Sequence, residues 1–139
     1  MENRKIIPDS ATKLQDAGIV AVSAAGTYVL DLGSGRTQAL VYIDCSAAEV
    51  DTGDELYTIS FQGTNTAAFG GTDIQDLAMI QLGDATQLPG AADKTTGLYR
   101  FPVDNFDGQS TWRYVRLYIT IAGTIATGIN FEAYLAKHE

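Results

Sequence analysis

The sequence predicts an all-β domain in which two antiparallel sheets form a sandwich. Apolar and polar residues alternate from Ile19 onward, with almost nothing at helical spacing. Segments rich in glycine or aspartate separate the alternating runs and suit tight turns. The chain has 139 residues, 45% of them apolar and 19% charged, which is typical of one globular domain with its own core. About eight short strands in a chain of this length favour a jelly-roll topology.

The clearest strand spans residues 112–122. Val115, Leu117 and Ile119 share one face of it and predict a buried row. The opposite face carries Trp112, Tyr114, Arg116 and Tyr118. A second strand over 129–136 follows after a link with a glycine at each end, so we predict that the two strands form a hairpin.

The other strands follow the same period of two. Residues 39–45 carry apolar side chains on both faces, which predicts a central strand. Residues 56–62 alternate cleanly, with Tyr57, Ile59 and Phe61 predicted to point inward. Further candidate strands lie at residues 19–23, 27–31, 76–83 and 98–103.

Residues 1–18 stand apart from this pattern, and residues 19–139 make up the predicted sandwich domain. The first segment is polar and contains Pro8, so we predict an N-terminal extended arm, or one short helix capped by Asp9 or Ser10. Its apolar pair, Ile6 and Ile7, has no evident place in the sandwich. The arm is therefore predicted to dock elsewhere.

Charge and composition argue against several functions. Nine basic and 17 acidic residues give a net charge of −8, which disfavours nucleic acid as a partner. No apolar run is long enough to span a bilayer, so no membrane partner is expected. The lone histidine, His138, is the penultimate residue, and the lone cysteine, Cys45, follows an apolar stretch that predicts its burial. We therefore expect no enzyme, no cofactor and no transition metal.

Two acidic segments and one aromatic row have competing interpretations. Residues 51–55 and 104–108 both have carboxylates that a calcium ion would accept. We favour a turn for residues 51–55, whereas a capped hairpin corner and an ion site explain residues 104–108 equally well. The outward row of aromatics beside Arg116 fits a carbohydrate platform, a protein interface, or ordinary packing within the sheet.

Several short motifs occur in a fixed order over nearly the whole chain. They are Asp9-Ser10, Asp31-Leu32-Gly33, Ser60-Phe61-Gln62-Gly63-Thr64, Phe101-Pro102-Val103, Arg113-Tyr114-Val115-Arg116-Leu117-Tyr118, Ala122-Gly123-Thr124 and Phe131-Glu132-Ala133-Tyr134-Leu135. This order resembles that in the Bbp16-type capsid cement proteins of Bordetella-type tailed bacteriophages. The resemblance is strongest in the Arg-Tyr-Val-Arg-Leu strand, the Ala-Gly-Thr after it and the closing Ala-Tyr-Leu.

This resemblance implies a structural virion protein on the outside of an HK97-like phage head. Such a decoration protein bridges neighbouring capsomers and stabilises the expanded shell. Its partners would be the major capsid protein and further copies of itself, as a homodimer or as another symmetric oligomer. It would be made in the host cytoplasm and reside on the capsid exterior.

Within that role we predict two sets of contact residues. The arm residues Arg4, Lys5, Ile6 and Ile7 would meet the capsid, and Tyr114, Arg116 and Tyr118 would lie at a subunit interface. The alternative function is a carbohydrate-binding β-sandwich module on a virion fibre or a secreted protein. It would use Trp112, Tyr114 or Tyr118 to stack on sugars.

Overall fold

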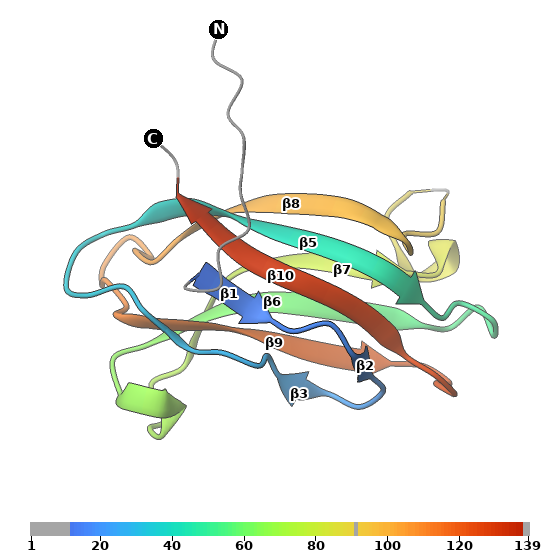
Figure 1. Cartoon of the computed structure of the whole chain (residues 1–139), viewed down its shortest axis with the longest axis horizontal. Helices are drawn as coiled ribbons and strands as arrows, with labels where there is room; N and C mark the ends of the chain where they lie inside the picture. The colour runs from blue at the N-terminus through green and yellow to red at the C-terminus, as the bar shows by residue number, and fades with distance from the viewer. Residues whose placement is uncertain (1–11, 91, 138–139) are drawn as a thin grey trace, which may run out of the picture.

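The computed structural model describes residues 12–90 and 92–137 and confirms the predicted all-β sandwich of two antiparallel sheets (Figure 1). Sheet A has the order β1 (Lys13–Gln15), β10 (Ile129–Lys137), β5 (Gln38–Ala48) and β8 (Gly97–Asp104), and β2 (Ile19–Val20) also pairs with β10. Sheet B has the order β3 (Ala24–Ala25), β9 (Tyr114–Ala122), β6 (Leu56–Thr64) and β7 (Gln75–Gly83), and β4 (Leu30–Asp31) also pairs with β9. Two short 3₁₀ turns, η2 (Ala67–Phe69) and η3 (Ala85–Gln87), lie in the connections on either side of β7.

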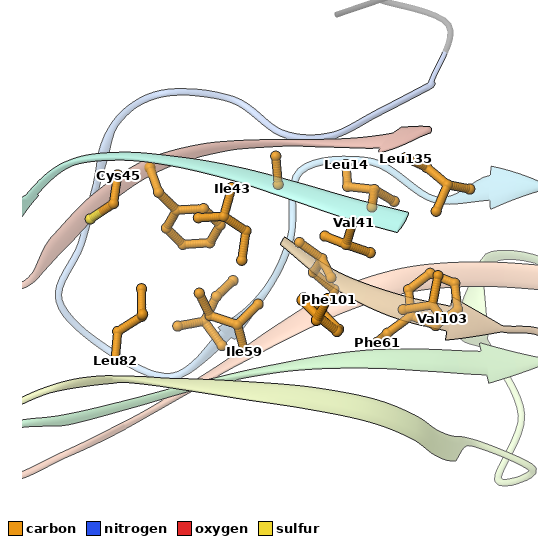
Figure 2. Close-up of a cluster of buried hydrophobic side chains, with 14 of the residues drawn as sticks. Leu14, Val41, Ile43, Cys45, Ile59, Phe61, Leu82, Phe101, Val103 and Leu135 are labelled. Carbon is orange, nitrogen blue, oxygen red and sulfur yellow. The ribbon is translucent and has the colours of Figure 1, made fainter. Parts of the chain in front are cut away.

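The core lies between the two sheets and is made by the predicted inward rows. Val41 and Ile43 of β5 point from sheet A toward Ile59 and Phe61 of β6 in sheet B, as Figure 2 shows. Each such side chain contributes about 1.5–3 kcal/mol when it leaves water. Cys45 is buried in the same cluster, as predicted, and behaves as a small apolar side chain.

The predicted hairpin between residues 112–122 and 129–136 is wrong. The two segments do form strands, β9 and β10, but β9 pairs with β6 in sheet B and β10 pairs with β5 in sheet A. The link between them therefore crosses from one sheet to the other. A link with glycines at both ends fits either arrangement, and the strand pairing is decided by β5 and β6, far away in the sequence.

Side-chain contacts fix the crossing link. The carboxylate of Glu49 accepts hydrogen bonds from the backbone N–H groups of Ala126, Thr127 and Gly128. Gly128 has a φ of 104° and lies so close to Val20 that a Cβ would collide with its carbonyl oxygen. Such a conformation favours glycine on both grounds.

The N-terminal part of the described chain joins both sheets. Leu14 of β1 is fully buried in the core, so part of the range 1–18 belongs to sheet A. The strands predicted at 19–23 and 27–31 are replaced by the shorter β2, β3 and β4. In the described residues no helix is long and apolar enough to cross a membrane.

Candidate functional site

The structure brings the predicted residues Tyr114, Arg116 and Tyr118 together on the outer face of sheet B. They point away from the core because Val115 and Leu117, between them on β9, point into it. All three side chains are half-buried. We call the surface formed by these residues and their neighbours on β6 and β7 the outer B face.

Trp112 does not extend this row. It precedes β9, and its Cβ lies against Gly63 so closely that a Cβ on that glycine would come within 2.7 Å of it. The indole N–H donates to a carboxylate oxygen of Asp107 over 3.1 Å. Trp112 therefore packs at the end of the sandwich.

Arg116 is at the centre of the outer B face. Its Nε donates to the side-chain oxygen of Gln62 over 3.0 Å, and Gln62 in turn donates its amide N–H to Asp76 over 2.9 Å. The guanidinium carbon lies 4.1 Å from the ring centroid of Phe69 and 5.6 Å from that of Tyr118. These contacts fix the orientation of the guanidinium group.

Arg116 lacks a counter-ion. Within residues 12–90 and 92–137, the salt bridges involve Lys13, Arg36 and Arg113 but not Arg116. Burial lowers the pKa of the Arg116 guanidinium, because no carboxylate compensates for the lost water. A guanidinium group that is held in place, half-buried and unpaired with a carboxylate presents N–H donors that suit an anionic group.

Phe69 reaches Arg116 from a strained turn. Ala68 and Phe69 have φ values of 58° and 56°, a left-handed conformation that costs a residue with a Cβ about 1–2 kcal/mol. Asp73 holds the loop by accepting hydrogen bonds from the Thr64 and Thr66 hydroxyls and from the Asn65 backbone. Backbone strain of this kind gathers at functional sites.

Sequence reasoning missed Phe69 and Asp76 as members of this face. Phe69 is the one large apolar residue in the small-residue connection 63–71, and that contrast was the available signal. Asp76 meets Gln62 only because the register shifts at a bulge between Phe61 and Gln62. The alternation pattern does not reveal such a shift.

Arg113, three residues before Arg116 on the same chain, is paired internally. Its guanidinium donates two hydrogen bonds to Asp31, at 2.8 and 2.9 Å. Arg113, together with the Gly33 backbone N–H, lowers the pKa of Asp31 to about 2. The pair fastens the segment around β4 to the start of β9.

Both acidic segments form turns, which is the interpretation favoured for residues 51–55 and one of the two left open for residues 104–108. Glu55 is fully buried and accepts hydrogen bonds from the backbone N–H groups of Thr52 and Asp54. In the second segment, Asp107 accepts from the backbone of Gln109 and Ser110. Among the described residues, no group of three or more His, Cys, Asp or Glu side chains is arranged to hold a metal ion.

A groove of about 540 Å³ lies where the edges of the two sheets separate, between β7 and β8. Leu77 and Ala78 line it from β7, and Pro102 and Val103 line it from β8. A smaller hollow of about 180 Å³, lined by Ser60, Asp76 and Met79 among others, adjoins the outer B face at β7.

The predicted capsid-contact residues Arg4, Lys5, Ile6 and Ile7 lie outside the described residues, so that prediction stands as made. A scan against protein-family models finds no match to the chain, and a search of curated proteins finds no similar sequence.

Proposed function

We propose that the protein is a capsid cement or decoration protein that binds the outside of an HK97-like phage head and stabilises its expanded shell. The proposal starts from the resemblance of the short motifs to phage cement proteins. The observation that carries it further is that several of those motifs contact one another in sheet B. Asp31 binds Arg113, and Gln62 binds Arg116, so side-chain hydrogen bonds join three separate motifs.

We further propose a jelly-roll topology, as expected of that family. In support, the order β1-β10-β5-β8 faces the order β3-β9-β6-β7, with β4 beside β3 along β9. With β1 and β2 counted together, and likewise β3 and β4, the chain changes sheet at every connection except the one between the paired strands β6 and β7. Nested Greek keys produce this arrangement.

Stabilisation of the head follows from linkage. A protein that binds the expanded shell and not the compact one shifts the equilibrium toward expansion, by about 2.7 kcal/mol per site when its free concentration is 100 times Kd. Many copies on one shell multiply this free energy. A rigid β-sandwich suits the task because little conformational entropy is lost on docking.

The test is co-sedimentation of the purified protein with compact and expanded heads of its source phage. We expect saturable binding to expanded heads alone.

A chain lacking residues 1–11 should bind expanded heads more weakly with an unchanged β circular dichroism spectrum, because the predicted arm contacts would be gone. The deletion stops before β1, so the buried Leu14 stays in place.

The alternative, carbohydrate binding, draws on the half-buried Tyr114 and Tyr118 beside Arg116. Aromatic rings next to a guanidinium suit stacking on sugars. If the folded protein binds neither form of the head but is retained on a glycan column, the cement proposal fails and the carbohydrate-binding function replaces it. Loss of retention in Tyr118→Ala would then place the sugar on the outer B face.

A further inference from the structure

The outer B face carries one cation and one carboxylate that lack opposite charges. Gln62 lies between Arg116 and Asp76, accepting from the Nε of one and donating to the Oδ1 of the other. In the described part of the chain, no ion pair uses either residue, and no other hydrogen bond to either side chain is present. The two terminal N–H₂ groups of Arg116 and the second oxygen of Asp76 are therefore free to bind an outside partner.

The strand register arranges this face in two rows that cross sheet B. In one row Arg116 of β9 lies beside Gln62 of β6, which lies beside Asp76 of β7. In the next row Tyr118, Ser60 and Met79 occupy the same three strands. Met79 is 61% exposed, an unusual position for a large apolar side chain. In both rows the central residue belongs to β6.

We propose that two copies of this chain pack their outer B faces together about a twofold axis that runs along β6, with Arg116 of each copy donating to Asp76 of the other. The inference rests on the cement function proposed above, whose family resemblance implies self-association, and it deepens that function by assigning the surface and the ion pairs. An axis along β6 places β9 of one copy over β7 of the other. Each row then faces the same row of the other copy, with the order of its three residues reversed.

The charges make this face complementary to itself. A twofold interface uses the same patch on both copies, so each residue must find its partner within that patch. Arg116 lies on one side of β6 and Asp76 on the other. The twofold axis therefore brings each Arg116 to the Asp76 of the other copy and creates two equivalent ion pairs. In the neighbouring row, Tyr118 of one copy meets Met79 of the other, a contact that the polarisable thioether favours.

The site is also fixed before binding. Phe69, Tyr118 and Gln62 hold the Arg116 guanidinium, and the turn that delivers Phe69 is strained. A side chain that is already ordered loses little entropy when it docks. Arginine and tyrosine are enriched among the residues that dominate interface affinity, and the two stand side by side on β9.

Charge exchange tests the proposal. Arg116→Asp and Asp76→Arg should each weaken dimerisation at least about tenfold, since like charges then face each other across the axis. An equimolar mixture of the two variants should form a heterodimer with near wild-type affinity, because both of its ion pairs are then complementary. Sedimentation equilibrium gives the masses and affinities. Recovery in the mixture also shows that both variants fold.

The matched control is Arg100→Asp on the outer face of sheet A, an exposed arginine whose substitution should leave the dimer intact. A monomeric wild-type protein, single variants that dimerise normally, or a mixture that forms no heterodimer would each overturn the inference. Head binding by the wild-type protein is measured separately. If the dimer behaves as expected but no head binds, the cement function fails and this interface stands. If heads bind while the variants dimerise normally, the cement function stands and this interface fails.

Discussion

On the outer face of sheet A, the charges around Lys13 pair with one another, whereas the outer B face leaves a cation and a carboxylate without an ion pair. On sheet A, Lys13 lies 2.9 Å from Asp16 and 3.9 Å from Glu132, with its ammonium 5.6 Å from the centroid of the Tyr134 ring. On sheet B, the Arg116 side chain is half-buried. Among the described residues, it donates its side-chain hydrogen bond to the neutral amide of Gln62 and not to a carboxylate. The charges around Lys13 are thus used in internal contacts, whereas Arg116 and Asp76 are available to a partner.

The same contrast recurs within sheet B. Arg113 binds Asp31 through two hydrogen bonds, which raises the pKa of its guanidinium, whereas burial lowers the pKa of Arg116. The paired arginine fastens a loop to the sheet. Arg116 contacts Phe69, Tyr118 and the neutral amide of Gln62, and it forms no ion pair with a carboxylate of the described residues. The ion pair of Arg113 thus stabilises this chain, whereas the unpaired Arg116 is suited to recognition of a partner.

The largest expected effect is a difference in the free energy of unfolding between substitutions on the two sides of β6. Phe61→Ala should lower the free energy of unfolding by about 3–5 kcal/mol, because its ring is buried between the sheets and leaves a cavity. Thr58→Ala, on the opposite side of the same strand, should cost less than about 1 kcal/mol. Urea unfolding at one fixed protein concentration measures both. Equal losses would show that the outer B face is as important to folding as the core.

A second prediction compares one ion pair from each sheet as the pH falls. Arg113 on sheet B and Lys13 on sheet A lower the pKa values of Asp31 and Asp16, the former to about 2 from 3.8. Because a lowered carboxyl pKa stabilises the fold above its unfolded value, that stability is present at neutral pH and is lost between about pH 4 and pH 2.

Asp31→Asn and Asp16→Asn should each make unfolding less dependent on pH in that range. The change should be larger for Asp31, because Arg113 donates two hydrogen bonds to its carboxylate and the pKa falls to about 2. Thermal melts from pH 5 down to about pH 2 follow the effect. A steeper acid dependence in Asp31→Asn than in the wild-type protein would contradict the assigned direction of its pKa shift.

Alternation in the sequence predicted the long strands and their inward residues because side chains in a strand point in opposite directions with period two. Tyr57, Ile59 and Phe61 were placed correctly by this rule alone. Strand pairing was not predictable in the same way. Whether β9 bonds to β10 or to β6 depends on contacts between residues far apart in the chain, and the glycine-bounded link after β9 was compatible with either.

The outer B face was partly predictable for a similar reason. Arg116 and Tyr118 follow from alternation along one strand. Their neighbours Gln62 and Asp76 depend on the register of two further strands and on a bulge, and Phe69 depends on a turn with rare backbone angles. Turn geometry of this kind has its usual signal in glycine or asparagine, and here alanine and phenylalanine occupy the positions.

The smallest expected effect concerns that turn. Ala68→Gly should stabilise the fold by about 0.5–1 kcal/mol, because glycine adopts a φ of 58° without the clash that a Cβ introduces. Ala67→Gly is the matched control and should destabilise slightly, since Ala67 has no positive φ to relieve. Both are measured by urea unfolding at the same protein concentration. If Ala68→Gly is no more stable than the control, the turn is not strained, and Phe69 contacts Arg116 without a conformational cost. If it is more stable but dimerises more weakly, the strained turn holds Phe69 in place to orient Arg116 for its partner.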